Sequence, residues 1–250
     1  MQATTGPALL LWDVDHTLIE NAGVSKENYA LAFELLTGRP ATHKATTGGR
    51  TDVVIIEDLL RSHGIDPSGY TSEERYAALV EAGRRNRSRL QERGHALPGA
   101  AECLVRLASE AGVRQSVLTG NVEPNARVKL GAFDLDEWLD FSVGAFGEEH
   151  TVRSRLVPVA QAKARDAFGF DPARDVTIVI GDTKLDVEAG LEGGARVIAV
   201  ATGGSSFEEL RTAGADAVLG DLTDVDALID AVHELIHMGA TGPRAYEPAG

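Results

Sequence analysis

The chain is short of cysteine, of long apolar runs and of positive charge. Cys103 is the only cysteine in 250 residues, so no disulfide can form within the chain and a reducing compartment fits best. No apolar run approaches the ~18 residues that a membrane-spanning helix needs. The first residues, MQATTGP, contain neither the basic stretch nor the apolar run of a signal peptide. We therefore expect a soluble cytoplasmic protein in which Cys103 is a small buried residue on a helix.

Positive charge is scarce because 24 lysine and arginine residues stand against 38 aspartate and glutamate residues, a formal net charge of −14. A nucleic-acid-binding protein needs a basic face to neutralise phosphates, and anionic membranes attract basic segments. We therefore expect neither nucleic acid nor a membrane as a partner. The same charge should repel a small anionic substrate, unless a bound cation reverses the field locally.

The composition is otherwise that of an ordinary globular protein, since 43% of the residues are hydrophobic and 25% are charged. Residues 8–12 form an apolar run without polar alternation, which predicts a buried strand of a parallel sheet. Later apolar segments alternate with helical patterns, and this alternation favours an α/β fold with a doubly wound, Rossmann-like parallel sheet. The further predicted strands are 113–118, 141–143, 176–180, 197–200 and 217–219, and the helices between them include 101–111, 124–130 and 156–168.

A different pattern follows the first strand, where helices and no convincing strand are predicted. These helices are 25–36, with Ser25 as N-cap, then 51–61, and a strongly charged segment over 72–93. The simplest architecture is an α/β core domain of residues 8–21 and 96–238, interrupted by a helical domain of residues 22–95. Residues 1–7 and 239–250 are expected to be flexible tails.

Polar residues follow three of the predicted strands. The first strand runs into Asp13-Val14-Asp15-His16-Thr17, another ends in Thr119-Gly120-Asn121, and a third ends in Gly181-Asp182, followed by Asp186. Each group could merely cap a helix, because such residues are common in βα loops. In a doubly wound sheet, however, ligands bind beyond the carboxyl ends of the strands. These residues are therefore expected to meet at one edge of the sheet.

Four carboxylates and an anion-binding loop at one edge favour phosphoryl transfer. Carboxylates as close as Asp13 and Asp15 are costly unless they share a cation or a proton, and Mg2+ binds carboxylate and phosphate oxygens together. One carboxylate can act as a nucleophile through an aspartyl-phosphate. A second can protonate the leaving alcohol and later activate water.

These residues resemble the haloacid dehalogenase (HAD) superfamily, especially its phosphatases. The first motif of that family, Asp-x-Asp-x-Thr, matches residues 13–17. The second, an apolar strand ending in Thr or Ser, matches residues 117–121, and the fourth, Gly-Asp-x-x-x-Asp, matches residues 181–186. The helical insertion is similar to the C1-type cap of phosphoglycolate phosphatase and β-phosphoglucomutase-like members.

The resemblance implies a role for each matching carboxylate. Asp13 would be the nucleophile and a Mg2+ ligand. Asp15 would be the general acid and base, and its backbone carbonyl would also reach the metal. Asp182 would ligate Mg2+ directly, and Asp186 through a water molecule.

The resemblance also implies how the phosphoryl group is held. Thr119 and the N–H groups of Gly120 and Asn121 would bind it. In the insertion, Arg50 follows a glycine pair and either contacts the substrate or simply begins a helix. His16 stands where the family often has glycine, and is either a loop residue or a substrate contact.

The third motif departs from the family pattern. A lysine usually begins the helix before the fourth motif, but residues 150–155 contain none. Lys163 lies too far into the following helix, and Lys129 belongs to the preceding one. We assign the role to Arg153, with Arg155 as second choice, because an arginine can bridge phosphate and carboxylate.

The C-terminal helix contains His233-Glu234-Leu235-Ile236-His237, which matches the zinc-protease pattern His-Glu-x-x-His. A zinc site needs a third protein ligand, and the only candidate after this segment is Glu247 in the tail. We therefore predict an amphipathic docking helix rather than a zinc site. Its apolar stripe comprises Val225, Leu228, Ile229, Val232 and Ile236.

We expect a Mg2+-dependent phosphatase (a phosphoric monoester hydrolase) that works through an aspartyl-phosphate. Its substrate would be a small phosphorylated metabolite, such as a sugar phosphate, a nucleoside-like phosphate or phosphoglycolate, chosen by the helical cap. The alternatives are a β-phosphoglucomutase-like phosphomutase and a non-catalytic metabolite-binding protein of the same fold. We expect the protein to be a monomer or a dimer.

Overall fold

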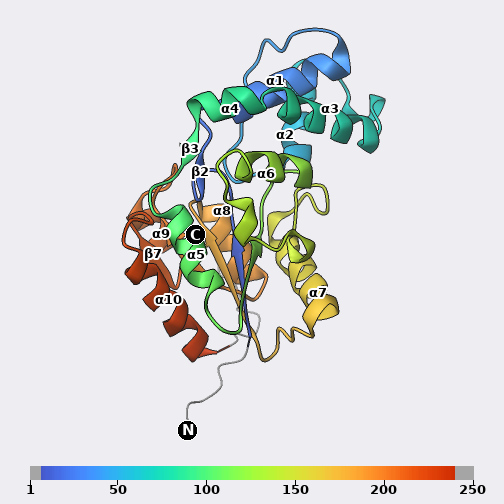
Figure 1. The fold of residues 1–250 in the computed structure, drawn as a ribbon. Coiled ribbons are helices and arrows are strands. Elements are labelled where there is room, and N and C mark those ends of the chain that lie inside the picture. Colours follow the sequence, from blue (N-terminus) through green and yellow to red (C-terminus); the bar gives the residue numbers. More distant parts are fainter. Residues whose placement is uncertain (1–6, 240–250) are drawn as a thin grey trace.

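A five-stranded parallel sheet forms the centre of the protein. The computed structural model describes residues 7–239, so the expected tails lie almost entirely outside the described residues. The strands lie in the order β4-β1-β5-β6-β7 with every neighbouring pair parallel. Helices cover both faces of this sheet (Figure 1), which confirms the predicted α/β class. The strands are β1 (Ala8–Trp12), β4 (Val113–Val117), β5 (Val176–Gly181), β6 (Arg196–Val200) and β7 (Ala217–Leu219).

The central strand β1 is apolar throughout because it is buried on both faces. Leu10 and Trp12 pack among residues of α5 and α10, whereas Leu9 and Leu11 pack among residues of α7. The side chains alternate between the two faces, as the strand geometry requires. The helices around the sheet are α5 (Ala100–Ala108), α6 (Glu123–Leu130), α7 (Leu156–Phe168), α8 (Lys184–Glu192), α9 (Phe207–Thr212) and α10 (Val225–Met238).

Four helices form a separate layer beside the sheet part of the molecule (Figure 1). They have a hydrophobic core of their own, which includes Phe33, Ile56, Leu60 and Leu79. A short antiparallel ribbon, which the sequence does not predict, stands where the chain enters and leaves this layer. The layer consists of α1 (Val24–Thr37), α2 (Asp52–Ser62), α3 (Ser72–Arg85) and α4 (Arg87–Arg93), and the ribbon of β2 (Ile19–Glu20) and β3 (His95–Ala96).

The prediction of a strand over 141–143 is wrong. Phe141–Val143 is a 3-10 turn because the Asp140 carboxylate accepts hydrogen bonds from the backbone N–H of Ser142 at 3.0 Å and from its hydroxyl at 2.5 Å. Such local side-chain bonds compete with sheet pairing. Within residues 7–239, the segment after this turn pairs with the β4 edge of the sheet through a single parallel bridge, between Leu118 and Ala145.

Two helix predictions also need correction. The charged segment 72–93 is not one helix, since it breaks at Asn86, whose side-chain amide donates to Asn28 at 2.9 Å. Ser25 is not an N-cap: the helix begins at Val24 after Gly23. The hydroxyl of Ser25 instead lies 3.3 Å from an Asp15 carboxylate oxygen, so a residue expected to be structural contacts the candidate site.

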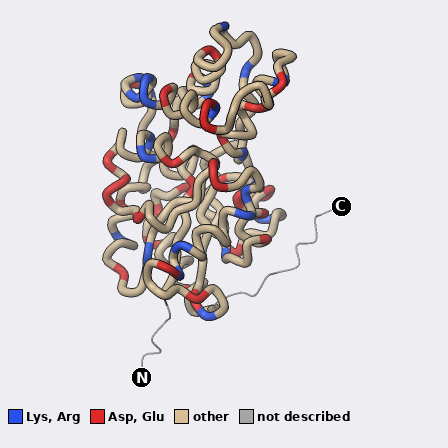
Figure 2. The backbone as a smooth tube through the Cα atoms, turned by 90° about the vertical axis from the view of Figure 1, so that its right-hand side faces the viewer, with Lys and Arg blue, Asp and Glu red and all other residues tan. Residues whose placement is uncertain are grey.

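Charged residues of both signs are interspersed along the described chain (Figure 2). Within residues 7–239, no helix combines the length and the apolar character that crossing a membrane requires. Cys103 is fully buried, and burial raises the pKa of its thiol to about 12. The thiol therefore stays protonated at neutral pH, as expected for a packing residue.

Candidate active site

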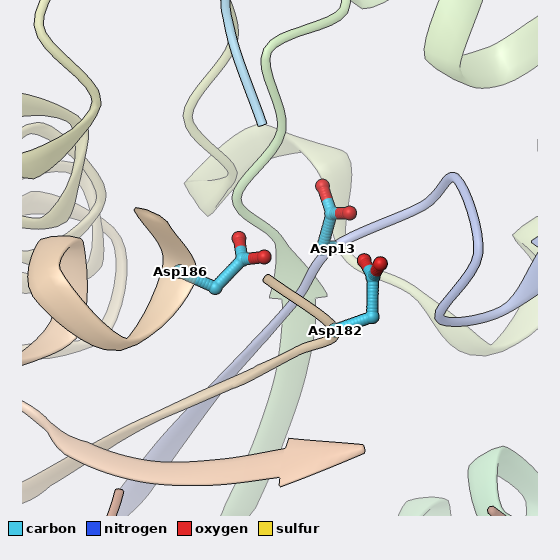
Figure 3. A group of neighbouring side chains, drawn as sticks. All are labelled: Asp13, Asp182 and Asp186. Carbon is cyan, nitrogen blue, oxygen red and sulfur yellow. The ribbon is translucent and has the colours of Figure 1, made fainter. Parts of the chain in front are cut away.

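Asp13 lies at the carboxyl end of β1 beside two other carboxylates. Its backbone N–H donates to the carbonyl of Ile180 at 2.8 Å, which extends the pairing of β1 with β5 by one residue. Asp182 follows β5, and Asp186 stands in the first turn of α8. The three residues each offer an oxygen within 4.8 Å of the others (Figure 3). Two of the strand ends singled out in the sequence therefore meet.

A capping box fixes Asp186 in this group. Thr183 is the N-cap of α8, and its backbone N–H donates to Asp186 Oδ2 at 2.9 Å, while the backbone N–H of Asp186 donates to the Thr183 hydroxyl at 3.2 Å. Because Oδ2 is held in this way, Oδ1 is the oxygen left for the site. Asp182 is held by Thr17, whose hydroxyl donates to it at 3.3 Å.

Arg153 is the cation that reaches this group. Its Nη2 atom lies 2.6 Å from Asp13 Oδ1 and 2.5 Å from Asp186 Oδ1, and its Nη1 atom donates to the carbonyl of Gly49 at 3.2 Å. Arg153 is buried, whereas Arg155 is exposed. Of the two arginines considered for the third motif, the structure brings Arg153 to the site and leaves Arg155 outside it.

Three carboxylates share this one guanidinium, and their pKa values show the shortage of positive charge. Burial raises the pKa of Asp13 to about 6, with Arg153 opposing the rise and Asp186 adding to it. Burial and the charges of Asp186 and Asp13 raise the pKa of Asp182 to about 9. A divalent cation would relieve this repulsion.

The donor set fits a hard cation such as Mg2+, which prefers carboxylate oxygens. Oδ1 of Asp186 is buried and has Arg153 as an ion-pair neighbour, but no hydrogen bond of acceptable geometry. It is therefore an oxygen available to a further ligand. The side chain of Asp15 does not belong to this group, so any contact of Asp15 with a metal would involve its backbone carbonyl.

The carboxylate of Asp15 is surrounded by donors instead. Lys129 Nζ lies 2.6 Å from Oδ2, Asn121 Nδ2 lies 2.9 Å from the same oxygen, and Asn21 Nδ2 lies 2.7 Å from Oδ1. Burial alone would raise the pKa of Asp15, but the charge of Lys129 and these hydrogen bonds outweigh it and hold the pKa at about 2. Asp15 is therefore ionised in this arrangement.

Thr119 follows β4 and presents a hydroxyl to the site. It is fully buried, and its Oγ1 atom accepts from Asn121 Nδ2 at 2.8 Å, so its own proton is free for another acceptor. Gly120 comes next and touches the helical layer, since a Cβ atom there would lie 2.2 Å from the carbonyl oxygen of Arg50. Glycine is required at this close approach.

A cavity of about 230 Å³ joins these groups, lined by Asp13, Asp15, Thr119, Arg153 and Asp182. Its remaining wall comes from the helical layer, from the loop before α2 and from loops that follow the strands. That wall includes Asn21, Ser25, Tyr29, Thr47, Arg50, Asp52 and Ile55. The cavity therefore lies between the strand ends and the helical layer.

Two residues left open by the sequence line this cavity. Arg50 lies in the wall, although its guanidinium forms an ion pair with Asp58. His16 also lies in the wall, and its Nδ1 atom is 3.0 Å from a Glu20 oxygen. Its backbone has a φ of 63°, a left-handed conformation that is costly for a residue with a side chain.

Comparison with known proteins agrees with this geometry. The model of the haloacid dehalogenase-like hydrolases matches residues 10–190. The chain belongs to this family. No curated protein sequence matches it.

Several solved structures share the HAD-like fold. CbbY from Rhodobacter sphaeroides in complex with phosphate is 24% identical, with 88% of this chain and 96% of that chain covered and a TM-score of 0.63. A predicted phosphoglycolate phosphatase from Haemophilus somnus is 17% identical (91% and 99% covered, TM-score 0.63). A putative β-phosphoglucomutase from Bacteroides vulgatus is 21% identical (94% and 92% covered, TM-score 0.62).

The two C-terminal histidines of this HAD-like hydrolase do not form a metal centre in the described residues. His233 Nε2 lies 3.5 Å from Glu110, and His237 Nδ1 contacts the carbonyl of His233 at 2.6 Å. Glu247, the third ligand considered, lies outside the described residues. The apolar stripe of α10 packs into the core as predicted, with Leu228 and Val232 fully buried.

Lys129 belongs to none of the motifs, yet it lies at the site of this HAD-like hydrolase, 2.6 Å from Asp15. It is a buried residue of α6. The signal was its position in the helix, because the buried residues of α6 recur with helical spacing and Lys129 falls among them: Asn125, Ala126, Lys129 and Leu130. A lysine on the buried face of a helix is rarely there without a partner.

Proposed function

We propose that this HAD-like hydrolase is a Mg2+-dependent phosphatase that hydrolyses a small phosphorylated metabolite through an aspartyl-phosphate on Asp13. The observation that carries this proposal is the group of three buried carboxylates with one guanidinium, placed beside a cavity that also contains the Thr119 hydroxyl. This combination offers a nucleophile, a cation site and an anion-binding group within one small space.

Asp13 would attack the phosphorus atom, and the bond from phosphorus to the leaving oxygen would break. Asp15 would take a proton from the monoanionic form of the bound phosphate ester and pass it to that oxygen as it leaves, so the product is a neutral alcohol. In the second step a water molecule would attack the aspartyl-phosphate while the ionised Asp15 takes its proton. Inorganic phosphate would then leave, and Asp13 would be a carboxylate again.

Arg153 and the loop after β4 would hold the phosphoryl group. Thr119 would donate its free proton, the N–H groups of Gly120 and Asn121 would donate to the same group, and Arg153 would pair with a phosphate oxygen as well as with Asp13. A Mg2+ ion held by the aspartate cluster and the Asp15 carbonyl would stabilise the charge that develops on the transferring group.

Residues 22–95 would act as a C1-type cap over the cavity. Their helices have a core of their own and supply Ser25 and Tyr29 to its wall, and the loop before α2 supplies Arg50. Such a layer excludes water from the reacting atoms and contacts the part of the substrate that leaves. We therefore propose that these residues choose the substrate, among sugar phosphates, nucleoside-like phosphates and phosphoglycolate.

A phosphomutase is the second candidate. The helical layer closely approaches the phosphate loop, as the Gly120–Arg50 contact shows. A walled cavity of this kind would also protect an aspartyl-phosphate from water until it transfers its phosphoryl group to an isomeric acceptor.

A panel of phosphorylated metabolites, incubated with the full chain and Mg2+, tests the proposal. A phosphatase should release inorganic phosphate from at least one of them, and EDTA should stop turnover until Mg2+ is returned. An isomeric phosphate without phosphate release would establish the phosphomutase instead. Turnover that Zn2+ restores and Mg2+ does not would refute the Mg2+ site and return attention to His233 and His237.

A further inference from the structure

Lys129 is a buried cation to which the proposed reaction assigns no part. It is 4% exposed, and its ammonium group lies 2.6 Å from both Asp15 Oδ2 and Asn121 Oδ1. Lysine side chains usually extend so that the ammonium group reaches water, and burying one costs several kcal/mol unless it is well paired. In this protein the buried ammonium group is paired with Asp15, one of the two carboxylates of the first motif.

The contacts of Lys129 set the direction of a second side chain. An ammonium group only donates, so the oxygen of Asn121 must face Lys129 and the nitrogen must face the other way. That nitrogen lies 2.9 Å from Asp15 Oδ2 and 2.8 Å from Thr119 Oγ1. Lys129 thus orients Asn121, and Asn121 in turn contacts both Asp15 and the phosphate-binding hydroxyl.

Lys129 belongs to a different part of the fold from two of the other donors to Asp15. Asn21 and Ser25 lie at the start of the helical layer. Lys129 belongs to α6, whose residues Ala126 and Leu130 are buried in the core of the sheet domain. Lys129 therefore reaches Asp15 from the sheet domain, whereas Asn21 and Ser25 reach it from the start of the helical layer.

We propose that Lys129 is a positioning residue that holds the Asp15 carboxylate apart from the aspartate cluster and directed at the leaving group of the substrate. The inference rests on the proposed function, because it assumes that Asp15 transfers a proton. Lys129 itself is not among the residues that line the cavity. Its effect should therefore appear only in the step that needs Asp15.

Two aryl phosphates separate this role from a structural one. Phenyl phosphate needs a proton on its leaving oxygen, whereas p-nitrophenyl phosphate expels a stable anion. With Lys129→Met, kcat/KM for phenyl phosphate should fall about 100-fold, the usual scale of general acid catalysis, and that for p-nitrophenyl phosphate less than about tenfold. An equal loss for both substrates, or no loss for either, would overturn the inference.

Lys163→Met is the matched control. Lys163, a residue of the core helix α7, also pairs with a carboxylate, at 2.8 Å from Glu149, but does not line the cavity. It should keep wild-type kcat/KM for both substrates. If the wild-type protein with Mg2+ hydrolysed neither aryl phosphate, the proposed function would fail and the inference with it, which is a different outcome from equal losses in an active enzyme.

A double variant keeps the test decisive if Lys129→Met alone does not fold. Asp15→Asn combined with Lys129→Met removes both charges of the pair, so no buried ion is left without a partner. If Lys129 acts only through Asp15, the double variant should have the kcat/KM of Asp15→Asn for phenyl phosphate within about threefold. A further loss of more than about tenfold would show a role independent of Asp15 and contradict the inference.

Discussion

Asp13 and Asp15 are separated by one residue, yet the structure surrounds them with opposite charge balances. Asp13 shares one guanidinium with Asp182 and Asp186, and burial raises its pKa to about 6. Asp15 forms an ion pair with Lys129 and accepts hydrogen bonds from neutral donors, and its pKa is held at about 2 despite burial. Around Asp13, carboxylates therefore outnumber basic groups, whereas the Asp15 carboxylate is already paired with a cation.

This difference in charge balance indicates that the two carboxylates have different chemical roles. A cation gains most where carboxylates outnumber basic groups, so the Asp13 half is where Mg2+ would bind and phosphorus would be attacked. The Asp15 half needs no metal and can exchange a proton with the substrate. Variants that alter residues around Asp13 or around Asp15, one at a time, test this assignment of roles.

The largest effect is expected for Asp13→Asn. Without the nucleophile, phosphate release from p-nitrophenyl phosphate should fall by at least about 10⁴-fold, while the circular dichroism spectrum stays unchanged. Asp166→Asn, which alters an exposed aspartate of α7, is the matched control and should be fully active. Full activity of Asp13→Asn would exclude it as the nucleophile.

The two arginines of the third motif should differ strongly. Arg153→Ala removes the guanidinium that pairs with Asp13 and should lower kcat/KM by about 100- to 1000-fold, as expected for a charge-stabilising donor. Arg155→Ala alters an exposed side chain and should change kcat/KM less than about threefold. Equal, mild effects in steady-state assays would show that neither arginine holds the phosphate.

The two halves should respond in opposite ways when one carboxylate is neutralised. In metal-free buffer, Asp182→Asn relieves repulsion and should raise the free energy of unfolding by about 1 kcal/mol, whereas Asp15→Asn leaves Lys129 unpaired and should lower it by about 2 kcal/mol. Urea unfolding measures both. Mg2+ should then raise the Tm of the wild-type protein but not that of Asp182→Asn, and shifts of the same sign in the two variants would contradict the division.

The smallest effect is expected at the turn that directly follows Asp15. His16 adopts a left-handed backbone conformation, so His16→Gly should leave the free energy of unfolding unchanged or raise it by up to about 1 kcal/mol. Thermal unfolding gives the answer. A clear loss of stability would mean that the contact between His16 and Glu20 outweighs the backbone strain.

Much of the fold could be predicted because its signals are local. The run at 8–12, the end of β5 and the capping pattern around Asp186 each depend on residues close together in sequence. Parallel pairing then brings these strand ends to one edge. The turn at Phe141–Val143 was missed because a single Asp140 side chain decides it.

The environment of Asp15 could not be predicted in the same way. Lys129 contacts Asp15 although the two residues are 114 positions apart in sequence. The contact depends on which face of α6 packs against Asp15, and no sequence motif specifies that packing. The approach of Arg50 to Gly120 likewise depends on how the helical layer packs. Motif spacing locates the residues that follow the strands, but not the side chains that come to them from other elements.

The most direct test of the account is to stop the reaction between its two steps. Asp15→Asn, mixed with p-nitrophenyl phosphate and Mg2+, should still transfer the phosphoryl group to Asp13 but should hydrolyse it slowly, because the group that activates water is gone. The account predicts a rapid release of one equivalent of p-nitrophenolate and a phosphoryl mass increment on the peptide that contains Asp13. Continued turnover at the wild-type rate, or a phosphoryl group on any other residue, would contradict it.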